Sequence, residues 1–319
     1  MKKIFSTLAA LSLAAVINAQ PGGGFGGFGG FQAPQVDLPA SETFKDVNYA
    51  DDGQAFHNCD IYLPQVEAKS YPVVIHIYGS AWFSNNSKGM ADLSTIVNAL
   101  LKAGYAVVCP NHRSSGDAKY PAQINDIKAV VRFVRGNAAK YKFDTSFIAT
   151  SGFSSGGHLA SLAATTSNAK KVEKVGNVEV DLEGNVGQFL KESSAVNAAC
   201  DWSGPIDLLN MDCGEHMGMG NSSPEAVLLG APVEGNENLY RTLSPITYID
   251  KNDCPAIIFH GKNDNVVPCC QGEEFYNELK KAGVKTEATF VEGGGHGMNM
   301  YSEENLSKMV DFLNAARKK

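Results

Sequence analysis

The chain has 319 residues, a net charge of −7 at neutral pH and 44% hydrophobic residues. Nucleic acids and anionic membranes are bound by clustered basic residues, so this charge argues against both as partners and favours a neutral or polar ligand. The seven cysteines permit disulfides but leave one over, and their spacing matches no metal-ligand pattern. The disulfide pairing therefore stays open at this point.

Residues 1–19 have the pattern of a signal peptide. Lys2 and Lys3 precede an apolar stretch at 8–17, which is too short to span a bilayer, and Ala19 suits a signal-peptidase site. No later stretch is long and apolar enough to cross a membrane. We therefore expect an exported protein, periplasmic or secreted, without a membrane span.

A low-complexity segment follows at residues 20–38. Its glycine- and phenylalanine-rich part, PGGGFGGFGGFQAPQ, loses too much backbone entropy on ordering to pack by itself, so we expect a linker. The spacing of its aromatic residues leaves a weakly adhesive segment as the alternative. Residues 39–319 contain no second linker or internal repeat, which predicts one domain.

Within this domain, short apolar runs rich in β-branched residues predict buried strands. They lie at 73–77, 105–109, 147–150, 195–200, 256–259 and 288–291.

Helical spacing of apolar residues occurs between several of these runs, most clearly at 127–134, and again at 306–313. Asp126 opens the first of these helices and is predicted to cap it or to pair with Arg113. Gly104 and Gly283 follow helical segments where a left-handed cap is favoured. Alternation of strands and helices predicts a mostly parallel sheet covered by helices on both faces.

The stretch GFSSGG at 152–157 lies between a predicted strand and a predicted helix. This context is typical of a nucleophile elbow, with Ser154 at its tip and the Ser155 amide facing a developing oxyanion. The alternative is a glycine-rich turn without chemistry.

A serine nucleophile needs a base, and the base needs an acid to orient it. Asp264 and His296 each follow a predicted strand, and so lie with Ser154 at the carboxyl edge of the sheet. Asp250 and Asp253 precede a predicted strand instead of following it, so they would lie at the opposite edge of the sheet from Ser154. Six other histidines compete for the role of base but are placed less well. His76 lies inside a predicted strand, His260 at a strand end and His158 on the helix after Ser154. The others have no such placement: His57, His112 and His216.

A second oxyanion donor usually comes from a loop after an early strand, and IYGSAW at 77–82 is placed for it.

With these motifs the chain resembles the α/β-hydrolase fold over residues 40–315. Within that fold it is similar to secreted carboxylesterases related to bacterial feruloyl and acetyl-xylan esterases and, more distantly, to hormone-sensitive-lipase-like esterases. The resemblance is carried by PVVIHIYGSAW (72–82), YPAQINDIKAVVRFVR (120–135), SGFSSGGHLASL (151–162), DWSGPIDLL (201–209), HGKNDNVVP (260–268) and EGGGHG (292–297).

The resemblance implies Ser154 as nucleophile, His296 as base and Asp264 as the acid that orients it, with the Ser155 amide in the oxyanion hole. The family's HGG[GA]W pattern reads YGSAW here, so the other donor is the amide of Ser80 or Ala81. A side chain at position 80 restricts positive φ and narrows the acyl pocket.

Three aromatic residues are candidates for substrate binding. Tyr78 supplies a hydroxyl to the site or packs in the core, Trp82 belongs to the core or the pocket wall, and Phe153 precedes the nucleophile.

The implied reaction is ester hydrolysis through an acyl-enzyme, without a metal or an organic cofactor. The expected partner is an ester-bearing carbohydrate or a small ester, with acetyl or hydroxycinnamoyl groups of plant polysaccharide as the acyl donors. Long connections at 170–194 and 212–232 are candidates for the alcohol-side pocket, with surface decoration as the alternative for the first. A prolyl-peptidase-like hydrolase and a non-catalytic binding module remain the rival functions.

Overall fold

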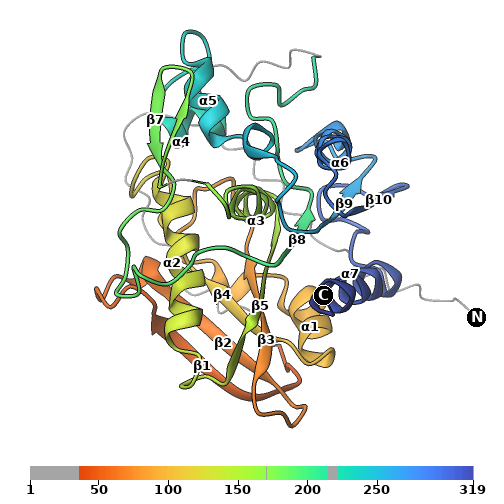
Figure 1. The fold of residues 1–319 in the computed structure, drawn as a ribbon. Helices are drawn as coiled ribbons and strands as arrows, with labels where there is room; N and C mark the ends of the chain where they lie inside the picture. Colours follow the sequence, from red (N-terminus) through yellow and green to blue (C-terminus); the bar gives the residue numbers. More distant parts are fainter. Residues whose placement is uncertain (1–35, 170, 215–221, 319) are drawn as a thin grey trace, which may run out of the picture. The chain divides into compact units, whose positions relative to one another are not determined.

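An eight-stranded sheet runs through the part of the chain that the structure, a computed structural model, describes: residues 36–169, 171–214 and 222–318 (Figure 1). The predicted signal peptide and most of the predicted linker lie outside the described residues. The strand order is β1-β2-β4-β3-β5-β8-β9-β10. β1 pairs with β2, and β2 with β4, in antiparallel fashion, whereas every other neighbouring pair is parallel. The predicted mostly parallel sheet is therefore confirmed.

The strands of the sheet are β1 (Ala40–Asn48), β2 (Asn58–Pro64), β3 (Tyr71–Ile77), β4 (Ala106–Pro110), β5 (Phe143–Phe153), β8 (Ala198–Trp202), β9 (Ala256–Gly261) and β10 (Thr286–Val291). A separate antiparallel hairpin is formed by β6 (Val172–Val175) and β7 (Val178–Asp181). All six predicted strands are present, and β1, β2, β6 and β7 were not predicted.

The α-helices are α1 (Asn98–Lys102), α2 (Ala122–Gly136), α3 (Ser155–Thr165), α4 (Pro224–Leu229), α5 (Glu237–Leu243), α6 (Cys269–Ala282) and α7 (Glu303–Arg317). Short 3₁₀ turns occur at η1 (Ala55–His57), η2 (Lys88–Met90) and η5 (Pro245–Tyr248), and a π-helical turn, η3 (Leu93–Val97), leads into α1. Gly104 and Gly283 both have a φ of 85°, which confirms the two predicted left-handed positions.

Helices cover both faces of the sheet because its central strands are apolar on both sides. Val73 and Ile75 belong to one buried cluster, together with α2, α3 and α6. Val74, from the same strand, belongs to a second cluster on the opposite face with α1 and α7. Those two helices lie side by side in Figure 1.

The order of the strands locates the ligand-binding edge. From β3 the chain moves outward to β4 and then crosses back over β3 to β5, so β3 and β5 flank a reversal of strand order. In open parallel sheets ligands bind at such a reversal, outside the carboxyl ends of the strands. The loop at 77–82 and the turn at Ser154 follow these two strands.

The predicted partner of Asp126 is confirmed, but the prediction that Asp126 opens the helix is wrong, because α2 begins at Ala122 and Asp126 lies inside it. Arg113 Nη2 lies 2.5 Å from Asp126 Oδ1, and the Arg113 amide donates to Oδ2 at 2.8 Å. His57 Nε2 lies 3.2 Å from the same carboxylate. Because Asp126 is fully buried, these contacts offset the cost of removing its charge from water.

Candidate active site

The strand-to-helix turn at Ser154 has the strained geometry of a nucleophile elbow. Ser154 has φ 56° and ψ −125°, a conformation that costs about 1–3 kcal/mol and persists only where the surroundings fix it. Its amide donates to the Trp202 carbonyl at 2.8 Å, and its carbonyl accepts from the His158 amide at 3.0 Å. A methyl group on Gly156 would lie 2.1 Å from the Ile77 carbonyl oxygen, so the close approach of α3 to β3 requires glycine there.

The three predicted catalytic side chains meet at this edge of the sheet. Ser154 follows β5, Asp264 follows β9 and His296 follows β10. His296 Nε2 lies 2.9 Å from Ser154 Oγ, and His296 Nδ1 lies 2.8 Å from Asp264 Oδ2. Ser154 and His296 are both partly exposed, so a substrate can reach them.

Asp264 faces His296 as an anion. Burial opposes its ionisation, but the hydrogen bond and charge of His296 and two backbone amides hold the pKa of Asp264 below its usual range. Those amides, of Val266 and Val267, donate to Oδ1 at 2.9 Å and leave Oδ2 for the imidazole. A second imidazole, His260, lies 3.7 Å from Asp264, but it donates to the Val267 carbonyl, and burial lowers its pKa. His296 is therefore the imidazole that Asp264 orients.

The predicted oxyanion loop, 77–82, lies against the start of α3. The Ser155 amide is in the first turn of this helix, where amides have no intrahelical acceptor. On the loop, the Ser80 amide donates to Ser155 Oγ at 2.8 Å. The Ala81 amide has no acceptor among the described residues, and Ala81 is partly exposed. The two candidate donors of the loop are thus not equivalent.

Two of the three predicted substrate-binding residues are buried. Tyr78 is 1% exposed and donates its hydroxyl to a backbone carbonyl at 3.0 Å, a placement that favours the packing alternative. Trp82 is 2% exposed and donates its indole N–H to His158 at 3.3 Å, so it belongs to the core. Phe153 is partly exposed, and its ring centroid lies 4.7 Å from that of His296. Phe153 therefore packs directly against the imidazole of the predicted base, His296.

A second serine–histidine–aspartate set joins two strands of the sheet, with His76 on β3 and Ser151 on β5, to Asp92 in the loop before η3. His76 Nδ1 is 3.1 Å from Ser151 Oγ, and His76 Nε2 is 3.3 Å from Asp92 Oδ2. Ser151 and His76 have no exposed surface, so no substrate reaches this serine. Burial thus separates the internal set from the one at Ser154.

The two long connections are anchored to helices. Within 170–194, the hairpin β6–β7 is followed by Glu183, which pairs with Lys128 at 2.6 Å and Arg132 at 2.9 Å, both on α2. Part of 212–232, residues 215–221, lies outside the described residues. The first connection therefore packs on α2.

A disulfide between Cys213 and Cys270 fastens the loop after β8 to α6. The five remaining cysteines are free. Next to the bridge, Gln271 Oε1 accepts the amides of Ile206 and Asp207 at 2.7 and 2.8 Å. This loop is therefore held at the carboxyl edge of the sheet by a covalent bond and a buried amide.

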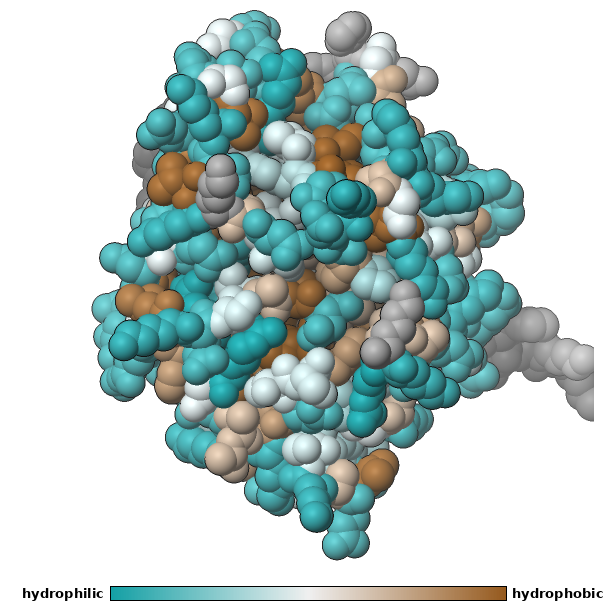
Figure 2. All heavy atoms as spheres, in the orientation of Figure 1, coloured by the Kyte–Doolittle hydropathy of each residue, from teal (hydrophilic) through white to brown (hydrophobic). Residues whose placement is uncertain are grey.

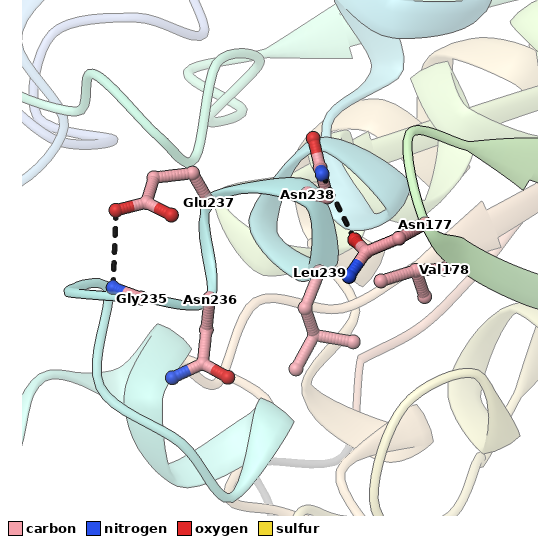
Figure 3. Close-up of a pocket in the computed structure, with 7 residues that line it drawn as sticks. All are labelled: Asn177, Val178, Gly235, Asn236, Glu237, Asn238 and Leu239. Carbon is pink, nitrogen blue, oxygen red and sulfur yellow. Dashed lines mark hydrogen bonds between the residues drawn. The ribbon is translucent and has the colours of Figure 1, made fainter.

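A pocket of about 300 Å³ lies between the turn of the β6–β7 hairpin and the start of α5 (Figure 3). Its lining contains none of the predicted site residues. Two pairs of its polar groups bond one another: Asn238 donates to Asn177 at 2.9 Å, and the Gly235 amide donates to Glu237 at 3.0 Å. The pocket therefore does not add to the site around Ser154.

Exposed apolar side chains lie next to the site residues in the sequence. Phe83, Val266 and Met298 are 46%, 58% and 61% exposed, and each follows the oxyanion loop or a triad residue by one or two positions. On the face shown in Figure 2, apolar side chains form small separate groups on a largely hydrophilic surface. Loops that carry the site thus also carry apolar surface.

The described ranges contain no group of three or more His, Cys, Asp or Glu side chains arranged to hold a metal ion. None of their helices has the length and hydropathy needed to span a bilayer.

Comparison with known proteins identifies relatives of this chain. The BD-FAE family model matches residues 59–279. The probable carboxylic ester hydrolase LipM of Mycobacterium tuberculosis is 31% identical over 238 residues, which are 74% of this chain and 51% of LipM. The chain spans about half the length of the curated relatives it matches.

Two solved structures are similar to the whole described domain. A truncated form of a carbohydrate esterase from gut microbiota is 44% identical with a TM-score of 0.86, covering 89% of this chain and 99% of that chain. A bifunctional GH43-CE protein of Bacteroides eggerthii is 50% identical with a TM-score of 0.82, covering 86% of this chain and 35% of that chain. The family model spans more than half of the chain and includes both Ser154 and Asp264. The chain therefore belongs to the BD-FAE family and has the α/β-hydrolase fold of its esterase relatives.

Proposed function

We propose that the protein is a carboxylic ester hydrolase that acts through an acyl-enzyme on Ser154. The observation that carries the proposal is the continuous hydrogen-bonded chain from Ser154 through His296 to Asp264, with distances of 2.9 and 2.8 Å. Membership of a family with esterase relatives supports it.

The first half of the reaction forms the acyl-enzyme. His296 Nε2 takes the proton of Ser154 Oγ while that oxygen attacks the ester carbonyl carbon. The imidazolium then donates this proton to the alkoxide, which leaves as the alcohol as the ester C–O bond breaks. Asp264 holds the Nδ1–H of the imidazole and stabilises its positive charge.

The second half releases the acid. Water attacks the acyl carbonyl while His296 takes its proton, and Ser154 leaves with that proton restored to its oxygen. Both tetrahedral intermediates place negative charge on the carbonyl oxygen, next to the first amides of α3. The side chains and amides of this chain supply each of these steps.

We propose that the substrate is an acetylated or feruloylated plant polysaccharide or oligosaccharide. Two similar solved structures, 44% and 50% identical, are named as a carbohydrate esterase and a GH43-CE protein. Phe83, Val266 and Met298 offer exposed apolar surface in the loops that carry the site residues, which suits an acyl group or the apolar face of a sugar.

The experiment measures initial hydrolysis of p-nitrophenyl acetate, p-nitrophenyl butyrate and methyl ferulate by the full chain. Ser154→Ala is expected to abolish turnover and labelling by a fluorophosphonate probe. Ser151→Ala is the matched control, because it removes the serine of the internal Ser–His–Asp set and should leave labelling intact. Acetate or ferulate release from isolated plant xylan then identifies the acyl group.

The rival functions give different results. Hydrolysis of a prolyl p-nitroanilide without hydrolysis of any ester would favour the peptidase and contradict the esterase. A wild-type chain that neither turns over an ester nor reacts with the probe would indicate a binding module.

We also propose that the chain is exported with residues 1–19 removed. Lys2, Lys3 and the apolar stretch at 8–17 support this, as does the Cys213–Cys270 disulfide, since disulfides persist in oxidising compartments. N-terminal sequencing of protein from the periplasm or medium should read from Gln20, and a chain found only in the cytoplasm with Met1 retained would contradict the proposal.

A further inference from the structure

We infer that Ser155 and His158 are positioning residues that hold the oxyanion loop, and that the oxyanion donors are the amides of Ser155 and Ala81 rather than Ser80. The inference rests on the proposed esterase function. It assigns a role to the Ser155 hydroxyl, which the esterase mechanism itself does not use.

The oxyanion loop is strained and needs external support. Ala81 has a φ of 50° and Trp82 a φ of 61°, both in the left-handed region that residues with a side chain disfavour. Each costs of order 1–3 kcal/mol and is kept only where surrounding contacts fix it. Within the loop, the Phe83 amide donates to the Ser80 carbonyl at 2.9 Å and closes the turn. This bond does not fix the turn relative to Ser154. From outside the loop, the Ser115 amide donates to the Trp82 carbonyl at 2.8 Å, and two further contacts come from α3.

One external contact comes from the residue after the nucleophile. Ser155 Oγ accepts the Ser80 amide at 2.8 Å, and Ser155 is 2% exposed. The Ser80 amide is thus engaged by a buried hydroxyl, and turning this amide toward an oxyanion would break the bond and leave the hydroxyl without its donor. The Ala81 amide, one residue further along, remains without an acceptor in the described structure.

A second contact comes from the same face of α3. Trp82 Nε1 donates to His158 Nδ1 at 3.3 Å, which requires a neutral imidazole with its proton on Nε2. Nε2 donates that proton to the Leu243 carbonyl at 2.8 Å, and burial lowers the pKa of His158 to about 4. His158 is therefore neutral near neutral pH.

The two contacts form a clamp. Ser155 and His158 are three residues apart on α3, so their side chains lie on one face of the helix. They hold Ser80 and Trp82, the residues on either side of Ala81. Ser155 also supplies its own amide to the oxyanion, so this residue fixes the position of one donor relative to the other, as preorganised stabilisation requires.

The test compares Ser155→Ala with Ser161→Ala in the full chain. Ser161 lies on the same helix, is equally buried, and its hydroxyl has no partner among the described residues. Loss of a whole oxyanion donor costs about 10²–10³ in kcat, so a loosened donor in Ser155→Ala should cost about 10–100-fold. KM should change less than threefold because the contact acts on the transition state. Ser161→Ala should retain the wild-type kcat.

A second pair of variants tests the other half of the clamp. His158→Gln keeps a neutral acceptor for the Trp82 indole and should retain more of the wild-type kcat than His158→Leu, which removes it. Thermal unfolding of all four variants separates loss of kcat from loss of folding.

Two outcomes for Ser155→Ala would overturn the inference and leave the proposed function standing. Wild-type kcat in Ser155→Ala would show that the hydroxyl positions nothing, and a raised kcat would show that the freed Ser80 amide serves the oxyanion. A wild-type chain that hydrolyses no ester and is not labelled at Ser154 would instead overturn the proposed function and this inference with it.

Discussion

Gly156 is required by the approach of two backbones. A methyl group at this position would lie 2.1 Å from the Ile77 carbonyl oxygen, and backbone atoms on both sides must shift to admit it. Gly156→Ala should therefore lower the free energy of unfolding by about 1–3 kcal/mol, measured by urea denaturation. Gly89→Ala is the control, because a methyl group there meets nothing within 4 Å. Equal stability of the two variants would contradict the packing argument.

Asp264 contributes through charge as well as orientation. Its carboxylate accepts two backbone amides and faces His296, so Asp264→Asn keeps the size of the side chain but cannot stabilise the imidazolium. We expect kcat for p-nitrophenyl acetate to fall about 10³–10⁴-fold. Circular dichroism should show an unchanged fold, and a loss of less than tenfold would mean that another group orients His296.

Residues at strand ends were predictable from the sequence, but side-chain pairing was not. Asp264 and His296 were identified because each follows an apolar run, and carboxyl ends of parallel strands share an edge. The bond from Ser80 to Ser155 joins residues 75 positions apart, and no local pattern signals it. Tyr78 was ambiguous for the same reason, since its burial depends on packing from outside its own loop.

Strands with a continuous apolar run were predicted, and strands without one were not. The six predicted strands form the parallel part of the sheet, and all of them except the half-exposed edge strand β10 are largely buried. β1 lies at the edge and is largely exposed, so its sequence has no apolar run for a prediction to use. The 170–194 connection was predicted as a loop, because its short strands are mostly polar and half exposed.

The disulfide is the strongest single constraint on the loop after β8. Cys213 and Cys270 are 57 residues apart, and closing a loop of this length in the unfolded chain corresponds to about 4 kcal/mol of stability. Replacing both with serine should lower the melting temperature markedly. Cys269→Ser is the matched control, since it removes the neighbouring free thiol and keeps the bridge. Identical melting in oxidising and reducing buffer would contradict this contribution.

The stability of the whole domain should depend on pH through a buried carboxyl. Asp201 is 1% exposed, its Oδ1 accepts the Gly204 amide at 2.9 Å, and its Oδ2 has no partner in the described structure. Burial raises the pKa of Asp201 to about 7, although the Gly204 amide opposes the shift. In the unfolded chain the carboxyl of Asp201 has a pKa of about 4. Between about pH 4 and about pH 7 the folded state therefore holds one more proton than the unfolded state. The stabilisation linked to the protonated carboxyl of Asp201 is complete below about pH 4 and is lost as the pH rises through about 7.

Asp201→Asn removes this titration. Relative to wild type, the variant should gain stability between pH 4 and pH 8, by up to about 4 kcal/mol. Urea denaturation at both pH values measures the difference, and Asp311→Asn, at an exposed position of α7, is the control. An unchanged difference between Asp201→Asn and wild type across this range would contradict the burial argument.

The contact between Ser154 and His296 spans 142 residues, and the Tyr105 hydroxyl reaches Asn314 across 209. Synthesis proceeds from the N-terminus, so the elbow is made long before its base and the helix that closes the sheet. A growing or C-terminally shortened chain thus carries an unactivated serine. On the proposed mechanism, catalytic competence is acquired late, and turnover would report that the chain has been made and folded at least through His296.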